Sequence, residues 1–226
     1  MIKKLSLALL CLAGSAHAYD NGYKPGDTWT LEESFLENKE GSGRFRQGDP
    51  KTIYNSDDAI WFYLEALPGD EAANATPFEF CGYHRIGLGW GDEQSQPPEQ
   101  EPPRIEGYPY IVRGAGSAQT TIFVHPGQQK DLIVAWQAPI SGSFKAEATF
   151  ERGGELGDGQ HISWASKDGI LAEVDVEPVA GTKEIATKST VVKKGDRLYF
   201  RVNCRGSAND DSGVIYLQVT YEAPAK

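Results

Sequence analysis

Residues 125–151 read HPGQQKDLIVAWQAPISGSFKAEATFE, and this stretch decides the expected fold. Asp131–Trp136 is a short apolar run, and Ser143–Glu151 alternates apolar with polar residues. An alternation with a period of two is typical of a strand with one buried face, whereas a short apolar run fits a strand buried on both faces. The turn residues of Ala138–Gly142 lie between the two segments. The stretch therefore predicts two consecutive strands joined by a turn.

The same pattern continues to the C-terminus. Arg197–Val202 alternates apolar and polar residues, and so does Val214–Tyr221. Short strands at regular spacing, separated by turns such as Gly157–Gly159 and Lys167–Gly169, are the signature of a sandwich or barrel. No segment from Tyr19 onward shows a sustained helical period in its apolar residues. We therefore expect an all-β fold, a two-sheet antiparallel sandwich of the jelly-roll type with about 9–11 strands.

The N-terminal third is less regular and is expected to contain long irregular loops. Ala59–Leu64 is almost entirely apolar or aromatic, which predicts a central strand. Leu31–Leu36 is the best candidate for a short helix, but we interpret it as part of a strand that begins at Trp29. The prolines of Glu93–Pro103 cannot donate hydrogen bonds to a sheet, so this segment is expected to be an exposed loop. Because the first third has too few apolar residues for its own core, residues 19–226 are predicted to form a single domain.

The first 18 residues have the pattern of a signal peptide. Lys3 and Lys4 precede the apolar run Leu5–Ala13, and Ala16-His17-Ala18 has the small residues that a signal peptidase needs. The apolar run is too short to span a membrane, and no later segment is apolar enough to do so. We therefore expect no membrane insertion, and a location in the bacterial periplasm or outside the cell.

The charge of the chain excludes one class of partner. The 226 residues carry a formal charge of −10, and loss of the two leader lysines makes the mature chain more acidic. An acidic surface repels phosphate backbones and anionic lipids. We therefore expect no nucleic-acid partner.

Three cysteines are present, and Cys11 lies in the predicted leader. Cys81 and Cys204 remain as a pair, and pairs of cysteines in exported proteins commonly form disulfides. A Cys81–Cys204 disulfide is therefore predicted. Two buried free thiols, or half of a metal site, are the alternatives that the sequence leaves open.

Five short motifs follow one another in a particular order. They are His125–Gly127, Trp136-x-Ala138-Pro139, Gly157–Gly159, Lys194–Asp196 and the Asn/Asp-rich loop Asn209–Asp211. In this order they resemble the jelly-roll accessory modules attached to bacterial polysaccharide-degrading enzymes. The resemblance covers about Ala59–Tyr221, and its motifs begin at His125.

The resemblance implies a stand-alone secreted protein that binds a polysaccharide or another glycan without catalysis, through exposed loop aromatics. The sequence departs from the family pattern at the last strand. Where those modules tend to have an aspartate, this chain has Tyr216-Leu217-Gln218. The departure weakens a ligand or calcium role carried over to this position.

Trp90 is the leading candidate for a ligand contact. It lies in a glycine-rich segment close to Tyr83, His84 and Arg85, which are ligand-binding candidates with it, because aromatic residues in such polar loops are often exposed and functional. Tyr108, beyond the proline-rich loop, is a further candidate. Packing and binding remain equally open for Trp90, whereas two other tryptophans lie in apolar strands and are expected in the core: Trp61 and Trp136.

The metal candidates are Asp158, Asn209, Asp210 and Asp211. Calcium takes six to eight oxygen ligands, and such loops supply carboxylates and backbone carbonyls. The same residues are the commonest turn formers, and this turn chemistry favours ordinary solvated turns. A Ca²⁺ site therefore stays an alternative.

No catalytic motif is present, although the many Asp and Glu residues leave a two-carboxylate glycosidase open. Two alternatives to glycan binding follow. One is a structural or protein-interaction role in the cell envelope or extracellular matrix, with Glu93–Pro103 as the contact to a protein partner. The other is a small polysaccharide-active enzyme with its site near Tyr83, His84 and Arg85.

Overall fold

The computed structural model describes residues 22–32, 35, 60–78, 80–84, 87–91, 108–114, 121–153, 156–209 and 211–225. Of residues 80–84, 87, 88 and 90 it describes the backbone alone. The predicted signal peptide (residues 1–18) and the proline-rich loop Glu93–Pro103 lie outside the described residues.

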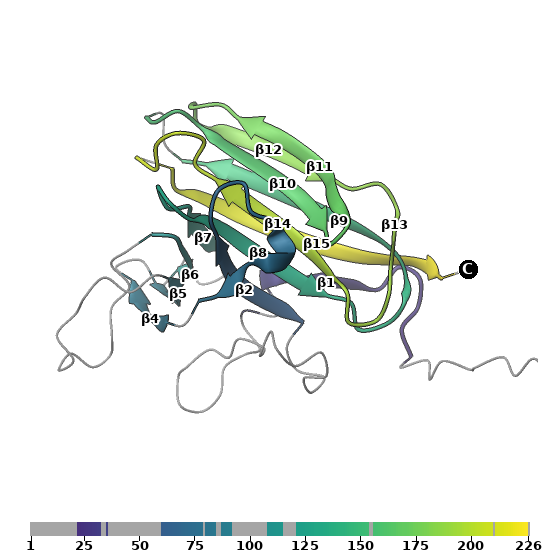
Figure 1. Cartoon of the computed structure of the whole chain (residues 1–226). Helices are drawn as coiled ribbons and strands as arrows, with labels where there is room; N and C mark the ends of the chain where they lie inside the picture. Colours follow the sequence, from purple (N-terminus) through teal and green to yellow (C-terminus); the bar gives the residue numbers. More distant parts are fainter. Residues whose placement is uncertain are drawn as a thin grey trace, which may run out of the picture.

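Two antiparallel sheets pack as the layers of a sandwich (Figure 1). The larger sheet has the order β12-β9-β15-β7-β6-β5-β4, with β1 paired to β15 and β13 paired to β9. Its strands are β1 (Thr28–Thr30), β4 (Phe80–His84), β5 (Gly87–Gly91), β6 (Tyr110–Gly114), β7 (Ile122–His125), β9 (Gly142–Arg152), β12 (Gly181–Ala186), β13 (Thr190–Val192) and β15 (Gly213–Pro224).

The smaller sheet has the order β11-β10-β14-β8-β2-β3. Its strands are β2 (Trp61–Ala66), β3 (Thr76–Pro77), β8 (Asp131–Gln137), β10 (Gln160–Ser166), β11 (Gly169–Val176) and β14 (Arg197–Asn203). A short 3-10 helix, η1 (Ala72–Asn74), lies in the segment between β2 and β3. From β7 to β10 the chain alternates between the two sheets, so the sequence-based expectation of an all-β antiparallel sandwich is confirmed.

The described residues form 15 strands rather than the expected 9–11, because short pieces such as β3 and β13 pair separately. The strand expected to continue through Leu31–Leu36 is wrong beyond Thr30. Leu31, Glu32 and Phe35 are helical, and both Leu31 and Phe35 are buried. Residues four apart lie on the same side of a helical turn, so this turn places both apolar side chains in the core.

The core fills the space between the inner faces of the two sheets. The larger sheet contributes alternate residues of β9 and β15, and the smaller sheet contributes those of β8, β10 and β14. Trp61, Trp136 and Trp164 are fully buried, which confirms that the first two are core residues. The Trp136 ring lies 5.0 Å from Phe144 across the layers, within the range of favourable aromatic pairs.

The strand alternation leaves both outer faces of the sandwich available to polar side chains. On the smaller sheet, the segment around η1 covers part of the outer face and buries Phe62, Leu64 and Tyr199 beneath it. Arg201 holds this segment in place, since its guanidinium donates to the carbonyl of Asp70 at 2.6 Å and to that of Leu67 at 2.8 Å. No helix among the described residues has the length and apolar character required to cross a membrane.

Cys204, next to the end of β14, is a free thiol that is 3% exposed. The predicted Cys81–Cys204 bond is not seen, and the side chain of Cys81 lies outside the described residues. Burial raises the pKa of the Cys204 thiol above its usual value, and the carboxylates of Asp211, Asp131 and Asp158 raise it further.

We predict that Cys204 resists alkylation by iodoacetamide in the folded protein, because the thiol is buried and its thiolate form is disfavoured. In guanidinium chloride without reductant it should be alkylated completely, as measured by mass spectrometry of the peptide that contains it. Protection that persists in guanidinium and is lost only after reduction would instead show the disulfide that the sequence predicts.

Candidate functional site

Three of the ligand-binding candidates lie on two paired strands of the larger sheet. Tyr83 and His84 belong to β4 and Trp90 belongs to β5, with Cys81 opposite Trp90 in the register. Their side chains lie outside the described residues, as does all of Arg85. Their role as a ligand site therefore stays a prediction.

Tyr108 is the one ligand-binding candidate whose side chain is described, and it is 49% exposed. Its ring stacks on the imidazole of His125, with centroids 4.0 Å apart, and lies 5.7 Å from the ring of Tyr110. His125 is buried, and its Nδ1 lies 2.7 Å from the carbonyl oxygen of Pro126. The His-Pro-Gly turn thus supports an exposed tyrosine at the start of β6.

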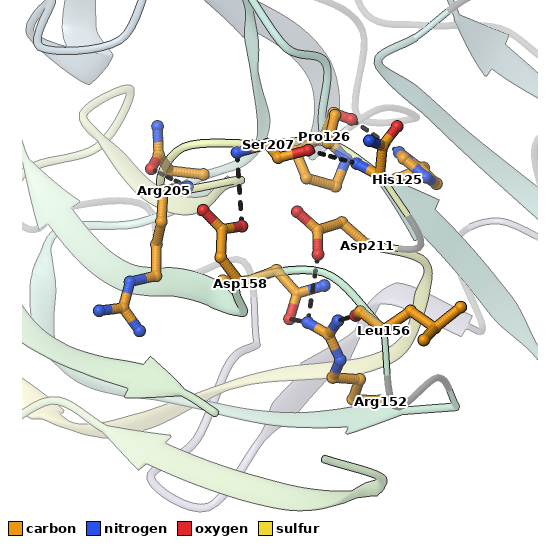
Figure 2. Close-up of polar contacts among 12 residues, drawn as sticks. His125, Pro126, Arg152, Leu156, Asp158, Arg205, Ser207 and Asp211 are labelled. Atoms are coloured by element: carbon orange, nitrogen blue, oxygen red, sulfur yellow. Dashed lines mark hydrogen bonds and ion pairs between the residues drawn. The ribbon is translucent and has the colours of Figure 1, made fainter. Parts of the chain in front are cut away.

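Two of the predicted metal residues, Asp158 and Asp211, lie in one cluster of loops (Figure 2). Asp158 lies in the turn before β10, and its Oδ1 accepts a hydrogen bond from the backbone N–H of Ser207 at 3.4 Å. Asp158 approaches Gly206 closely, since a Cβ at position 206 would lie 2.7 Å from Oδ2 and the carboxylate would have to shift. Gln128 also binds this loop, since it donates to the carbonyl of Gly206 at 2.7 Å.

Asp211 is the residue of this cluster that sequence reasoning described least well. It is fully buried, and its Oδ1 lies 3.2 Å from Nη1 of Arg152, which is equally buried (Figure 2). Arg152 also donates to Oε1 of Gln160 at 2.5 Å and to the carbonyl of Leu156. The guanidinium of Arg152 therefore supplies the positive charge at Asp211, and Asp211 is not a solvated turn residue.

This arrangement bears on the calcium alternative. Asp158 and Asn209 are exposed, and Asp210 lies outside the described residues. Within the described ranges, no group of three or more His, Cys, Asp or Glu side chains could hold a metal ion. Because a cationic side chain already faces Asp211, the described residues do not fit a Ca²⁺ site centred on this carboxylate.

One signal in the sequence could have revealed the pair. Arg152 continues the inward-facing series of β9 after Phe144, Ala146, Ala148 and Phe150. A charged residue in line with the core requires a partner, because an isolated buried charge is strongly unfavourable.

We predict that Arg152→Met lowers the free energy of unfolding by about 3–5 kcal/mol, because it leaves Asp211 as an uncompensated buried carboxylate. Urea unfolding followed by tryptophan fluorescence measures this loss. Arg205→Met is the matched control, since Arg205 is exposed and lies 4.0 Å from Asp175. Such a surface pair should contribute less than about 1 kcal/mol.

Thermal unfolding with and without Ca²⁺ tests the calcium alternative. Millimolar Ca²⁺ should change the Tm of the unmodified protein by less than about 2 °C, because no binding free energy is added to the folded state. A Tm that rises with Ca²⁺ and falls with chelator would contradict the assignment of Arg152 as the counter-charge.

A groove of about 470 Å³ lies on the outer face of the larger sheet. Its residues come from β1, β9, β12 and β15, four strands that are neighbours in space. Tyr216 is 41% exposed here, and the polar residues that line the groove with it are Thr30, Glu32, Glu147, Thr149, Glu184 and Gln218, of which Glu32 lies just after β1.

The strand register explains how these side chains meet. Thr149 of β9 lies opposite both Tyr216 of β15 and Glu184 of β12, so the three residues form one row across the sheet. In the next row Glu147 lies opposite Gln218, which in turn lies opposite Thr30 of β1. Directly opposed residues on one face have Cβ atoms about 4.5–5.5 Å apart, so each row is a continuous strip of side chains.

The groove is acidic. Glu32, Glu147 and Glu184 line it, and no Lys or Arg is present among its described lining residues. The nearby Lys145 donates to Oε1 of Glu147 at 2.7 Å, and this bond raises the pKa of the lysine. The groove thus offers an aromatic ring beside carboxylate, amide and hydroxyl groups, which can hydrogen-bond a polar ligand.

The alternation of Val214–Tyr221 predicted the last strand, and Tyr216-Leu217-Gln218 stood out in it only as a departure from a family pattern. The strand itself was foreseen. The sequence did not predict that β9, β12 and β1 lie on the same sheet close to β15. The order of strands in a sheet depends on contacts between distant parts of the chain.

The sheet pairing and the groove define the chain as an antiparallel β-sandwich protein with an open polar groove on one face. No known protein family matches the sequence, and no curated protein matches it either. The alternative contact through Glu93–Pro103 lies outside the described residues.

Solved structures with a loosely similar fold include three of different kinds. One is the CBM35 from Cellvibrio japonicus Abf62, with 13% identity, a TM-score of 0.32, and 72% of this chain and 98% of that chain covered. A Stig cyclase, Fisc from Fischerella sp. TAU, has 13% identity, a TM-score of 0.37, and coverages of 88% and 100%. A GH26-CBM35 β-(1,4)-mannanase from Podospora anserina has 11% identity, a TM-score of 0.33, and coverages of 50% and 23%. The chain thus spans about a quarter of the mannanase.

Proposed function

We propose that this protein is a non-catalytic glycan-binding protein and that the groove around Tyr216 holds the sugar chain. The observation that carries the proposal is the row Glu184–Thr149–Tyr216, which places an exposed aromatic ring beside hydrogen-bonding groups in one open groove. The C–H face of a pyranose packs on such a ring, while carboxylate, hydroxyl and amide groups bind its hydroxyls.

The charge of the groove narrows the class of glycan. Three glutamates line it, and its described lining contains no basic residue that could pair with an acidic sugar. The nearby Lys145 is already bonded to Glu147, and an anionic sugar brought beside these carboxylates would be repelled by them. The proposed ligand is therefore a glycan that lacks carboxylate and sulfate groups, rather than a polyuronate.

The proposal also includes the cellular location in which binding occurs. The predicted leader would export the chain to the periplasm or beyond, where polysaccharides of the cell surface and surroundings are found. An open groove on a sheet face suits such a ligand, because a polymer can lie along the sheet.

We predict that Tyr216→Ala weakens binding to a neutral polysaccharide at least about tenfold, equivalent to roughly 1.4 kcal/mol, because it removes the stacking ring. Affinity electrophoresis against a panel of neutral and acidic polysaccharides measures this effect. Tyr216→Phe should retain most of the affinity, since it keeps the ring. Because Tyr216 is exposed, the Tm should change little in both variants.

Tyr108→Ala is the matched control, since Tyr108 is a comparably exposed tyrosine outside the groove. If Tyr108→Ala lost binding and Tyr216→Ala kept it, the groove would not be the binding site. The loop aromatics that the sequence favoured would then be the better candidates. Release of reducing ends by the unmodified protein would refute a purely binding role and favour the enzyme alternative.

A further inference from the structure

A second hollow, of about 520 Å³, lies on the outer face of the smaller sheet. Its floor is made of β10, β14 and the start of β8, and its walls are the segment 69–72 and the turn between β10 and β11. The volume is in the range of small-molecule sites. Since the groove around Tyr216 lies on the other sheet, the two hollows are on opposite faces of the sandwich.

The floor is rigid and already formed. Asp131 is 1% exposed, and its carboxylate accepts hydrogen bonds from Nε of Arg201 at 2.5 Å and from Nδ2 of Asn203 at 2.6 Å. Arg201 also binds the carbonyls of Leu67 and Asp70, so the same guanidinium fixes one wall to the floor. A ligand would meet a preorganised surface, which reduces the entropic cost of binding.

Ser163 provides the observation that points to a ligand. It lies at the centre of the floor, opposite Arg201 of β14 and Glu173 of β11, and it is 4% exposed. Among the described residues, its hydroxyl has no hydrogen-bond partner. Its Oγ is not one of the fully buried polar atoms that lack a partner, so the small exposed part of this side chain faces the cavity, and a group that enters can take the place of water at the hydroxyl.

The charges around the cavity indicate the sign of the charge that a ligand would carry. Arg201 is matched by Asp131, and Lys167 lies 3.2 Å from both carboxylate oxygens of Asp196. Three carboxylates at the rim remain without a cationic partner among the described residues: Asp70, Glu71 and Asp168.

Two further carboxylates lie beside the floor on the neighbouring strand β11, and one of them, Asp175, also lies 4.0 Å from Arg205. The imidazole of His161 lies between Asp175, at 2.8 Å, and Glu173, at 3.3 Å. The hydrogen bond with His161 lowers the pKa of Asp175, which keeps this carboxyl in its charged form. The cavity therefore combines an excess of negative charge with a hydroxyl that is free to bond.

We propose that this cavity binds a small hydroxylated primary amine, the chemistry of an amino sugar. Its ammonium group lies among the rim carboxylates, and one of its hydroxyls hydrogen-bonds to Ser163. The proposal is independent of glycan binding in the groove around Tyr216, because it involves other residues on the other sheet.

The test is calorimetric titration of the full chain with glucosamine, glucose and N-acetylglucosamine. Glucosamine should bind at least about tenfold more tightly than either other sugar, because only glucosamine carries an ammonium group. Raising the ionic strength should weaken its binding, as expected for exposed rim charges. Equal binding of all three sugars, or no binding of glucosamine, would overturn the proposal.

Variants locate the site. Ser163→Ala should weaken glucosamine binding at least about tenfold without lowering the Tm, because the hydroxyl that it removes has no partner among the described residues. Asp168→Asn, on an exposed turn, should weaken it as well, whereas Glu151→Gln on the larger sheet should not. Unchanged affinity in Ser163→Ala would refute the assignment.

Two readouts separate this proposal from the proposed function. Tyr216→Ala should leave glucosamine binding unchanged, so loss of polysaccharide binding and loss of amine binding can be scored independently. In addition, changes in backbone amide shifts on adding glucosamine should map to β10, β14 and residues 69–72. Changes confined to β9 and β15 would place the amine in the groove and overturn the proposal.

Discussion

The packing of two sheets against each other is the interaction on which the rest of the structure depends. Each long strand buries every second side chain in the shared core, where the rings of Trp136 and Phe144 are in contact across the layers. Burial of apolar area is the main favourable term in folding, so this commitment fixes the register of β8, β9, β14 and β15. The other half of each strand then faces outward by necessity, and both candidate sites are built from those outward residues.

Two arginines connect the irregular parts of the chain to this core. Arg152 extends from the inner face of β9 and holds the loop before β15 through Asp211, while Arg201 extends outward from β14 and holds the segment before η1. Both are paired with a buried carboxylate, so each charge is compensated where water is excluded. Since the guanidinium has five donors in a fixed plane, it can bind a carboxylate and backbone carbonyls at the same time, which lysine does less well.

The sequence predicted the strands best where the alternation is strict, from His125 onward, because period two is a local property. It failed at Leu31 and Phe35, where burial of two side chains four residues apart required one helical turn. Site features were harder, since they combine distant segments: Arg152 and Asp211 are 59 positions apart. The groove likewise needs the spatial order of four strands, and no local pattern shows that Ser163 has no partner. Residue types suggested sugar chemistry, but the strand order determined which side chains meet.

The back-to-back position of the two outer faces has a consequence for valency. Packed sheets are separated by about 10 Å of core, and each outer face is a further side chain away. A ligand bound on one face therefore cannot touch the other face. It also cannot block the binding of a second ligand on the opposite face. Two ligands bound at the proposed sites would lie on opposite faces at the same time and a fixed distance apart, which is the geometry of an adaptor.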